Sequence, residues 1–325
     1  MTDFWGAARP YAEFGGGVGV LVGGAWLLVT GGTRVAAVLR VPAVIVGLTV
    51  VAFGTSAPEL FVSLVGALQG STGLALGNVI GSNVANIGLI LALAALVQPV
   101  QVERTLPRRE IPLLLAVSLV FAALVWDGTL GTADAGILVA GFAGFIAWTL
   151  AGARHGDVVV PAAPEVNLAP GHRVREFLVG MAWVIAGIAG LALGGELIVN
   201  AAVTLAKRYG MSETVIGLTL VAVGTSLPEL ATTLVAAWRR QDDLALGNIV
   251  GSNLFNILAV AGPVGLVAPL SETSGRHQSQ LASMVALAAV LYLFVRFGGG
   301  PIGRTRGGVL LVLYVAIMVS WMVGG

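Results

Sequence analysis

The chain has 325 residues, of which 57% are hydrophobic and only 10% are charged. An ordinary soluble domain is about 25% charged, so a soluble globular protein is excluded and a membrane protein with several spans is indicated. The net charge of +1 gives no support for a nucleic-acid partner. The absence of cysteine excludes thiolate and iron–sulfur sites, and three histidines in polar stretches disfavour zinc and haem.

Apolar segments between the charged residues predict ten membrane-spanning helices. A span needs roughly 20 apolar residues, and such segments lie at 14–33, 41–69, 72–98, 110–126, 130–152, 176–205, 212–238, 243–270, 279–296 and 307–323. The polar stretch from Ala153 to Glu176 is too short to hold a folded domain. It is therefore expected to be a linker between two halves.

The distribution of cations predicts the orientation. With the N-terminus outside, thirteen of the seventeen Lys and Arg residues fall in inside loops. This bias follows the positive-inside rule, so both termini are expected outside, in a multi-pass protein of the cell membrane. The first residues lack the basic start and small-residue cleavage site of a signal peptide, and no processing is expected.

An internal repeat relates the two halves. A shift of 170 residues aligns 47–87 with 217–257, with 24 identities in 41 positions. Each half then contains five helices, and an odd number of crossings forces the second half to enter the membrane from the opposite side. The expected fold is an all-α membrane protein of two inverted repeats, 1–152 and 176–325, joined by a cytoplasmic linker at 153–175. Inverted repeats are typical of secondary transporters with a site near the midplane.

Glu59 and Glu229 occupy matched positions in the repeat, near the centres of apolar helices. An acidic side chain at that depth costs roughly 2.5–3.5 kcal/mol and needs a partner or a water-filled cavity. Neither helix contains a Lys or Arg that could neutralise it. A bound cation is the remaining partner, and protonation of the carboxylate is the alternative. Glu196 has Ala25 as its counterpart, so we expect it to pair locally or to face an interface.

A proline precedes each of these glutamates, as Pro58 and Pro228. Proline removes a backbone donor and frees carbonyl oxygens one turn earlier. Hydroxyl groups flank each break, on Thr55, Ser56, Thr225 and Ser226. On the following helices, polar residues recur every four positions and form one stripe on each helix. They are Asn78, Ser82 and Asn86 in the first half, and Asn248, Ser252 and Asn256 in the second.

The repeated motifs thus offer two carboxylates and many neutral oxygens. This set matches Ca²⁺ and Na⁺ and argues against copper, zinc and nickel. Gly77, Gly81, Gly247 and Gly251 form GxxxG patterns that allow a neighbouring helix to approach closely. Two carboxylates balance one Ca²⁺, or two or more Na⁺ that share them, so competition for the same charge would couple the two fluxes.

At these residues the sequence resembles the sodium/calcium exchangers of the cation/Ca²⁺ exchanger superfamily. The resemblance implies that Glu59 and Glu229 bind Ca²⁺ with the Thr55 and Thr225 carbonyls. It also implies two flanking Na⁺ sites: Ser56 and Ser82 with the Ala52 carbonyl form one, and Ser226 and Ser252 with the Ala222 carbonyl form the other. Asn86 and Asn256 complete the predicted cation-binding set.

Two features depart from the family pattern. Some relatives carry an aspartate where Asn86 or Asn256 stands, so a third carboxylate is missing here, as in potassium-independent exchangers. The short linker also lacks the large cytosolic regulatory region of animal exchangers. The expected function is electrogenic, potassium-independent Na⁺/Ca²⁺ antiport by alternating access. It would proceed without an enzymatic reaction or a cofactor, with the lipid bilayer and the two ions as partners and no obligatory protein partner.

Three alternatives remain open from the sequence. An H⁺/Ca²⁺ or other divalent-cation antiporter could use the same fold, with protons carried by Glu59 and Glu229. An intramembrane hydrolase could use the two carboxylates as an acid/base pair, although their near-identical flanks favour equivalent roles. A passive cation channel is the third alternative.

Overall fold

The computed structural model describes residues 2–102, 109–155, 172–209, 222–271, 275 and 277–323, and this part of the chain is almost entirely helical. The first half contains α1 (Thr2–Leu39), α2 (Ala43–Val46), the π-helix η1 (Gly47–Val51), α3 (Ala52–Thr55), α4 (Ala57–Leu68), α5 (Thr72–Ala85), the π-helix η2 (Asn86–Leu91), α6 (Ala92–Val97), α7 (Glu110–Leu124), β1 (Thr129–Leu130) and α8 (Thr132–His155). The second half contains α9 (His172–Arg208), α11 (Ala222–Thr225), α12 (Leu227–Trp238), α13 (Asp242–Phe255), the π-helix η5 (Asn256–Ala261), α14 (Gly262–Val267), β2 (Leu270–Ser271), α15 (His277–Phe297) and α16 (Arg304–Val323).

The apolar helices confirm a multi-pass membrane protein. Within the described residues, seven helices are long and apolar enough to span a membrane, and the bent pair 43–55 and 57–68 adds an eighth. The fourth predicted span corresponds to α7, which has only 15 residues. The seventh is described only from Ala222 onward. The count of ten spans therefore stays a prediction, as does the linker, whose central residues 156–171 lie outside the described chain.

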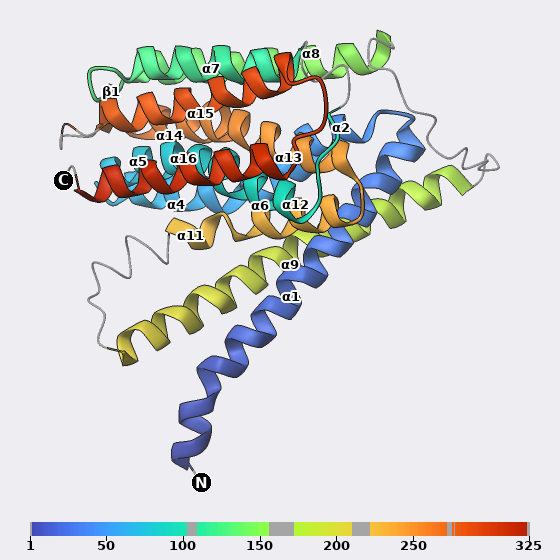
Figure 1. Ribbon diagram of the computed structural model, residues 1–325, viewed down its shortest axis with the longest axis vertical. Helices are drawn as coiled ribbons and strands as arrows, with labels where there is room; N and C mark the ends of the chain where they lie inside the picture. Colours follow the sequence, from blue (N-terminus) through green and yellow to red (C-terminus); the bar gives the residue numbers. More distant parts are fainter. Residues whose placement is uncertain are drawn as a thin grey trace.

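Two helix lengths were predicted wrongly. The helix expected at 14–33 extends from Thr2 to Leu39, and the one expected at 176–205 extends from His172 to Arg208. Hydropathy marks only the apolar part of a helix, whereas the backbone stays helical through the polar residues beyond it. At about 1.5 Å per residue, each of these helices is far longer than the bilayer core of about 30 Å. Both cross the remaining helices obliquely (Figure 1), and this tilt accommodates their length.

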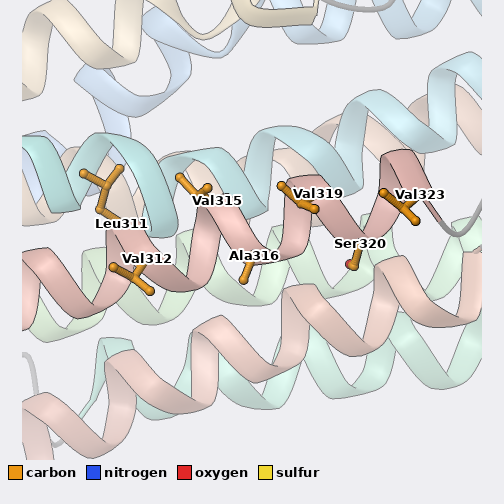
Figure 2. Close-up of a pocket in the computed structure, with 7 residues that line it drawn as sticks. All are labelled: Leu311, Val312, Val315, Ala316, Val319, Ser320 and Val323. Atoms are coloured by element: carbon orange, nitrogen blue, oxygen red, sulfur yellow. The ribbon is translucent and has the colours of Figure 1, made fainter.

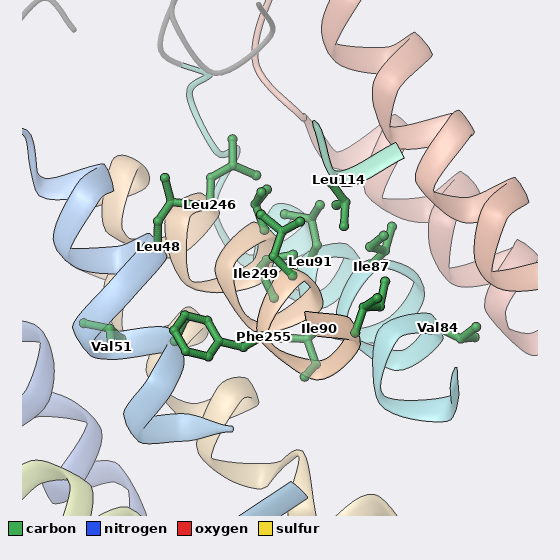
Figure 3. Packing of buried hydrophobic residues seen from close by; sticks show 14 of the residues in the cluster. Leu48, Val51, Val84, Ile87, Ile90, Leu91, Leu114, Leu246, Ile249 and Phe255 are labelled. Atoms are coloured by element: carbon green, nitrogen blue, oxygen red, sulfur yellow. The ribbon is translucent and has the colours of Figure 1, made fainter. Parts of the chain in front are cut away.

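The helices that carry the repeated motifs form the centre of the bundle. All residues of α13 from Leu244 to Phe255 are buried, and half of the residues of α5 are buried as well. Figure 3 shows apolar side chains of η1, η2, α7 and α13 packed together in this core. By contrast, α1, α9 and α16 expose many apolar side chains. The polar motifs are therefore shielded from lipid by the other helices.

Helices α1 and α9 pack backbone to backbone through glycines spaced seven residues apart. Gly24 faces Gly187 and Leu191, and a Cβ atom built on Gly24 would lie 2.6 Å from the Leu191 nitrogen. Similar close approaches occur along the whole contact, at Gly17, Gly31, Gly180 and Gly194. Increasing residue numbers on α1 meet decreasing numbers on α9, so the two helices are antiparallel. Small residues allow this close packing in membranes.

A short antiparallel pair of strands joins the two halves at one end of the bundle. Thr129 of β1 pairs with Ser271 of β2, and Leu130 pairs with Leu270. Beside them, Asp127 accepts hydrogen bonds of 2.9 Å from the backbone N–H and the hydroxyl of Thr129. These two bonds hold the pKa of Asp127 below its usual value. We call this the strand end of the bundle, and the opposite end, where α12 finishes, the latch end.

A shallow groove runs along α16 on the surface of the bundle (Figure 2). Its lining consists of Leu311, Val312, Val315, Ala316, Val319, Ser320 and Val323. The side chains are apolar apart from one serine, as expected for a helix face in contact with lipid. The lining of the groove contains no charged side chain.

Candidate cation-binding site

Each repeated motif breaks its span and places a glutamate at the start of a new helix. In the first half the helices on either side of Ser56 are bent by 43°. Pro58 then lies in the first turn of α4, and Glu59 follows it in the same turn. Glu229 has the same position in α12, after Pro228. A helix N-terminus favours negative charge, so the break reduces the cost of burying each carboxylate.

The two glutamates are hydrogen-bonded across the repeat. Ser56 Oγ donates to Glu229 Oε1 at 3.0 Å, and Ser226 Oγ donates to Glu59 Oε1 at 3.4 Å. Both carboxylates are almost completely buried, with exposures of 1% and 0%. Each half thus contributes the carboxylate to one pair and the hydroxyl to the other. The four residues belong to one site shared by both halves.

Several buried polar atoms in this region have no hydrogen-bond partner among the described residues. They include Oε2 of Glu59 and of Glu229, and both amide atoms of Asn86 and of Asn256. The ion pairs between described residues lie elsewhere, at Arg9–Glu13 and Arg34–Glu176. A buried carboxylate without a cationic partner is costly. A hard cation that takes oxygen ligands fits the carboxylate and amide oxygens of this set.

A second set of contacts joins α3 to the buried face of α13. Thr55 Oγ1 lies 3.2 Å from Asn248 Oδ1 and 3.4 Å from Ser252 Oγ. The same hydroxyl lies 3.3 Å from the Ala52 carbonyl, which also accepts the Ser56 N–H at 3.0 Å. Thr55, Ser252 and the Ala52 carbonyl, all in the predicted set, therefore lie together with Asn248.

The remaining predicted residues lie on the same central elements. Thr225, Ser226 and Ser82 are buried, and Ala222 is the first residue of α11. Asn86 and Asn256 each begin a π-helix, which the sequence reasoning did not anticipate. Inserted π-turns are frequent at functional sites.

Two site-supporting residues were missed from the sequence, Ser63 and Thr233. Asn78 Nδ2 donates to Ser63 Oγ at 2.9 Å, and Asn248 Nδ2 donates to Thr233 Oγ1 at 3.0 Å. Each bond joins a motif helix to the helix that follows it. The sequence could have indicated them, because Ser63 and Thr233 are matched polar positions one helical turn after the glutamates.

The two GxxxG patterns behave differently. A Cβ atom on Gly247 would lie 2.8 Å from the Val44 carbonyl, and one on Gly251 would lie 2.8 Å from Leu48. This confirms close packing of α13 against α2 and η1. Near Gly77 and Gly81 no described atom comes within 4 Å of such a Cβ. The segment that the repeat places opposite them, 214–221, lies outside the described residues, so close packing at the first pattern stays a prediction.

Helix α9 lies against both motif breaks. Ile188 contacts Gly54 in the first motif, and Val199 contacts Gly224 in the second. Glu196 is exposed on α9 and takes part in neither of the ion pairs that the described residues form. The expected local pairing of Glu196 is therefore not found in this part of the chain.

Charged and aromatic side chains fasten α1 and α9 at the latch end. Arg239, which follows α12, donates a hydrogen bond to Thr30 and lies 5.3 Å from the centre of the Trp26 ring. Arg34 pairs with Glu176 at 2.8 Å and lies 5.0 Å from the Trp183 ring centre. These contacts tie α1 to α9 and to the core. The repeat places Gln69 opposite Arg239 in the first half.

Comparisons with known proteins find similar proteins over nearly the whole chain. A family model described as "Sodium/calcium exchanger protein" matches residues 11–151 and 179–323. The chain is 37% identical to "Putative antiporter CaxA" of Alkalimonas amylolytica, over 92% of this chain and 94% of that one. It is 31% identical to "Sodium/calcium exchanger MaX1" of Methanosarcina acetivorans, over 93% and 95%. A solved structure of the sodium–calcium exchanger NCX_Mj covers 96% of this chain and 98% of its own, with 31% identity and a TM-score of 0.83.

Proposed function

The chain belongs to the sodium/calcium exchanger family, and from this premise we propose that it is an electrogenic antiporter that exchanges Na⁺ for Ca²⁺. The family is one of transporters, so the chain is a cation/Ca²⁺ antiporter and the intramembrane hydrolase is ruled out. Ca²⁺ and Na⁺ are cargo in this family, and no cofactor is indicated. The choice of Na⁺ as the coupling ion is our proposal.

One observation supports the proposal above the others. Glu59 and Glu229 are buried, come from opposite halves, and each retains an unpartnered oxygen. Together they supply two negative charges, which balance one Ca²⁺. Hydroxyl and amide oxygens around them suit Na⁺ equally well. Because both ions need the same carboxylates, entry of one ion favours release of the other.

We assign the ligands as the sequence predicted. Ca²⁺ would lie between Glu59 and Glu229, with the Thr55 and Thr225 carbonyls. Na⁺ would occupy flanking sites built by the following residues: Ser56, Ser82 and Ala52, and Ser226, Ser252 and Ala222. With amides instead of a third carboxylate at Asn86 and Asn256, the site has no additional charge for K⁺. If more than two Na⁺ replace one Ca²⁺, each cycle moves net charge.

We further propose alternating access, with the division into 1–152, 153–175 and 176–325 as two inverted halves and a linker. The contacts of Arg239 and Arg34 hold α1 and α9 against the core at the latch end. At the strand end the first part of α1 diverges from the bundle (Figure 1). With both termini outside the cell membrane, the latch end would face the cytoplasm, and this conformation would give access from outside.

The test is transport by the purified protein in proteoliposomes. An imposed Na⁺ gradient should drive ⁴⁵Ca²⁺ uptake, and a membrane potential should change its rate. Glu59→Gln and Glu229→Gln should each abolish uptake, because the site then keeps one carboxylate for a divalent ion. Uptake that persists unchanged in both variants would contradict the site assignment.

Replacing Na⁺ with choline separates the proposal from H⁺/Ca²⁺ antiport. At a fixed pH gradient, the Na⁺/Ca²⁺ exchanger should lose ⁴⁵Ca²⁺ uptake in choline. An H⁺-coupled antiporter would retain it, and the hydroxyl groups of Ser56 and Ser226 would then have no cargo to bind. Uptake in choline at the full rate would therefore refute Na⁺ coupling while leaving cation/Ca²⁺ antiport intact.

A further inference from the structure

Thr232 carries a buried hydroxyl group that the proposed site does not use. It lies on α12 three residues after Glu229, and residues at this spacing share one face of a helix. The side chain is completely buried, and its Oγ1 has no hydrogen-bond partner among the described residues. The adjacent Thr233 differs, because its hydroxyl accepts a bond from Asn248.

Several other hydroxyl groups in the helices of this chain bond to their own backbone. Thr49, Thr204 and Ser118 each donate to the carbonyl four residues earlier, at 2.7–2.8 Å. This is the usual outcome for Ser and Thr inside membrane helices. Thr232 makes no such bond. A buried hydroxyl that is unpaired is unfavourable, so its retention here calls for a ligand.

Unpartnered oxygen atoms of other residues lie on the elements next to Thr232. Glu229 Oε2 is on the same face of α12, and η2, which begins at Asn86, packs against α12. Both amide atoms of Asn86 also lack partners. Glu229, Asn86 and Thr232 together offer one carboxylate oxygen and two neutral oxygens. A single negative charge suits a monovalent cation better than Ca²⁺, which calls for both carboxylates.

The first half lacks this hydroxyl. The 170-residue repeat places Val62 opposite Thr232, whereas Glu59 and Asn256 match the other two members. Glu59 Oε2 and the Asn256 amide are unpartnered as well, so at these three matched positions the two halves differ in this one oxygen. The repeat symmetry of the site is therefore broken at this position.

We propose that Thr232 supplies a hydroxyl ligand to a Na⁺ ion held with Glu229 and Asn86, so that this pocket binds Na⁺ more tightly than its counterpart beside Val62. The proposal rests on Na⁺/Ca²⁺ exchange as the function. It adds an asymmetry between the two halves that the motifs themselves do not contain.

The test is Thr232→Val, which keeps the shape of the side chain and copies the residue of the other half. Na⁺-driven ⁴⁵Ca²⁺ uptake should need about tenfold more Na⁺ for half-maximal rate, since a hydrogen-bonding oxygen to a charged ligand is lost. Ca²⁺/Ca²⁺ exchange without Na⁺ should be unchanged. Thr232→Ser, which restores the hydroxyl, should need nearly the wild-type Na⁺ concentration.

Thermal unfolding of the purified protein gives a second readout. Without ions, Thr232→Val should be at least as stable as the wild type, because an unpaired hydroxyl is gone. Stabilisation by added Na⁺ should be reduced. An unchanged Na⁺ dependence, or an equal loss of Na⁺-driven and Ca²⁺/Ca²⁺ exchange, would overturn the assignment of Thr232. Failure of the wild type to couple Na⁺ to Ca²⁺ would instead refute the proposed function.

Discussion

Gly24 on α1 offers a direct test of the packing between α1 and α9. A Cβ atom there would lie 2.6 Å from the Leu191 nitrogen and 2.9 Å from the Gly187 carbonyl oxygen. Both are backbone atoms, so no rotamer change relieves the clash, and the helices would have to separate by about 0.8 Å to reach an ordinary contact. Overpacking of this kind costs about 1–3 kcal/mol. Alanine offsets up to about 1 kcal/mol through its better helix propensity.

The neighbouring Gly23 is a matched control, because no atom of the described residues outside its own stretch of α1 lies within 4 Å of a Cβ placed there. Gly23→Ala should therefore be neutral or slightly stabilising. In thermal unfolding followed by tryptophan fluorescence, Gly24→Ala should unfold several degrees below Gly23→Ala. Equal midpoints for the two variants would refute the backbone-to-backbone packing of α1 and α9.

Two further predictions concern the latch end and the orientation. Arg239→Gln, which introduces the residue found at Gln69, removes a hydrogen bond and a cation–π contact worth about 1–2 kcal/mol together. Apparent Ca²⁺ affinity measured from outside should fall and that from inside should rise. Equal changes in apparent Ca²⁺ affinity on both faces would contradict the proposal that this contact stabilises one conformation. Gln69→Ala is the control. Since the chain has no cysteine, Gln278→Cys and Gly303→Cys can be labelled singly. An impermeant maleimide added to intact cells should modify only the former, and the reverse pattern would invert the orientation.

Much of the helix arrangement was predictable because charge is so scarce. For the span formed by α13, η5 and α14 together, and for α15, the expected and observed bounds agree to within a few residues. The method failed for α1 and α9, since no hydropathy signal marks a helix that continues past the membrane. The π-helices at Asn86 and Asn256 were also unpredictable, because helix register there depends on packing against other elements.

The hydrogen-bond partners within the site could not be predicted from the sequence. The repeat indicated that Glu59 and Glu229 act together, yet the crosswise bonds from Ser56 and Ser226 depend on how the halves meet. Local sequence says nothing about this contact. For the same reason Asn248 was interpreted only as part of a polar stripe, although it also contacts Thr55 of the other half.

The position of α9 against both Gly54 and Gly224 has a consequence for leakage of ions. Helix α9 is packed tightly against α1 along its length. We therefore expect the pair to move as one rigid unit that contacts both halves of the core. Such a unit cannot move away from one motif break without moving toward the other. We therefore expect that the two entrances exclude each other mechanically, so that the cell's ion gradients do not drain through the protein between transport cycles.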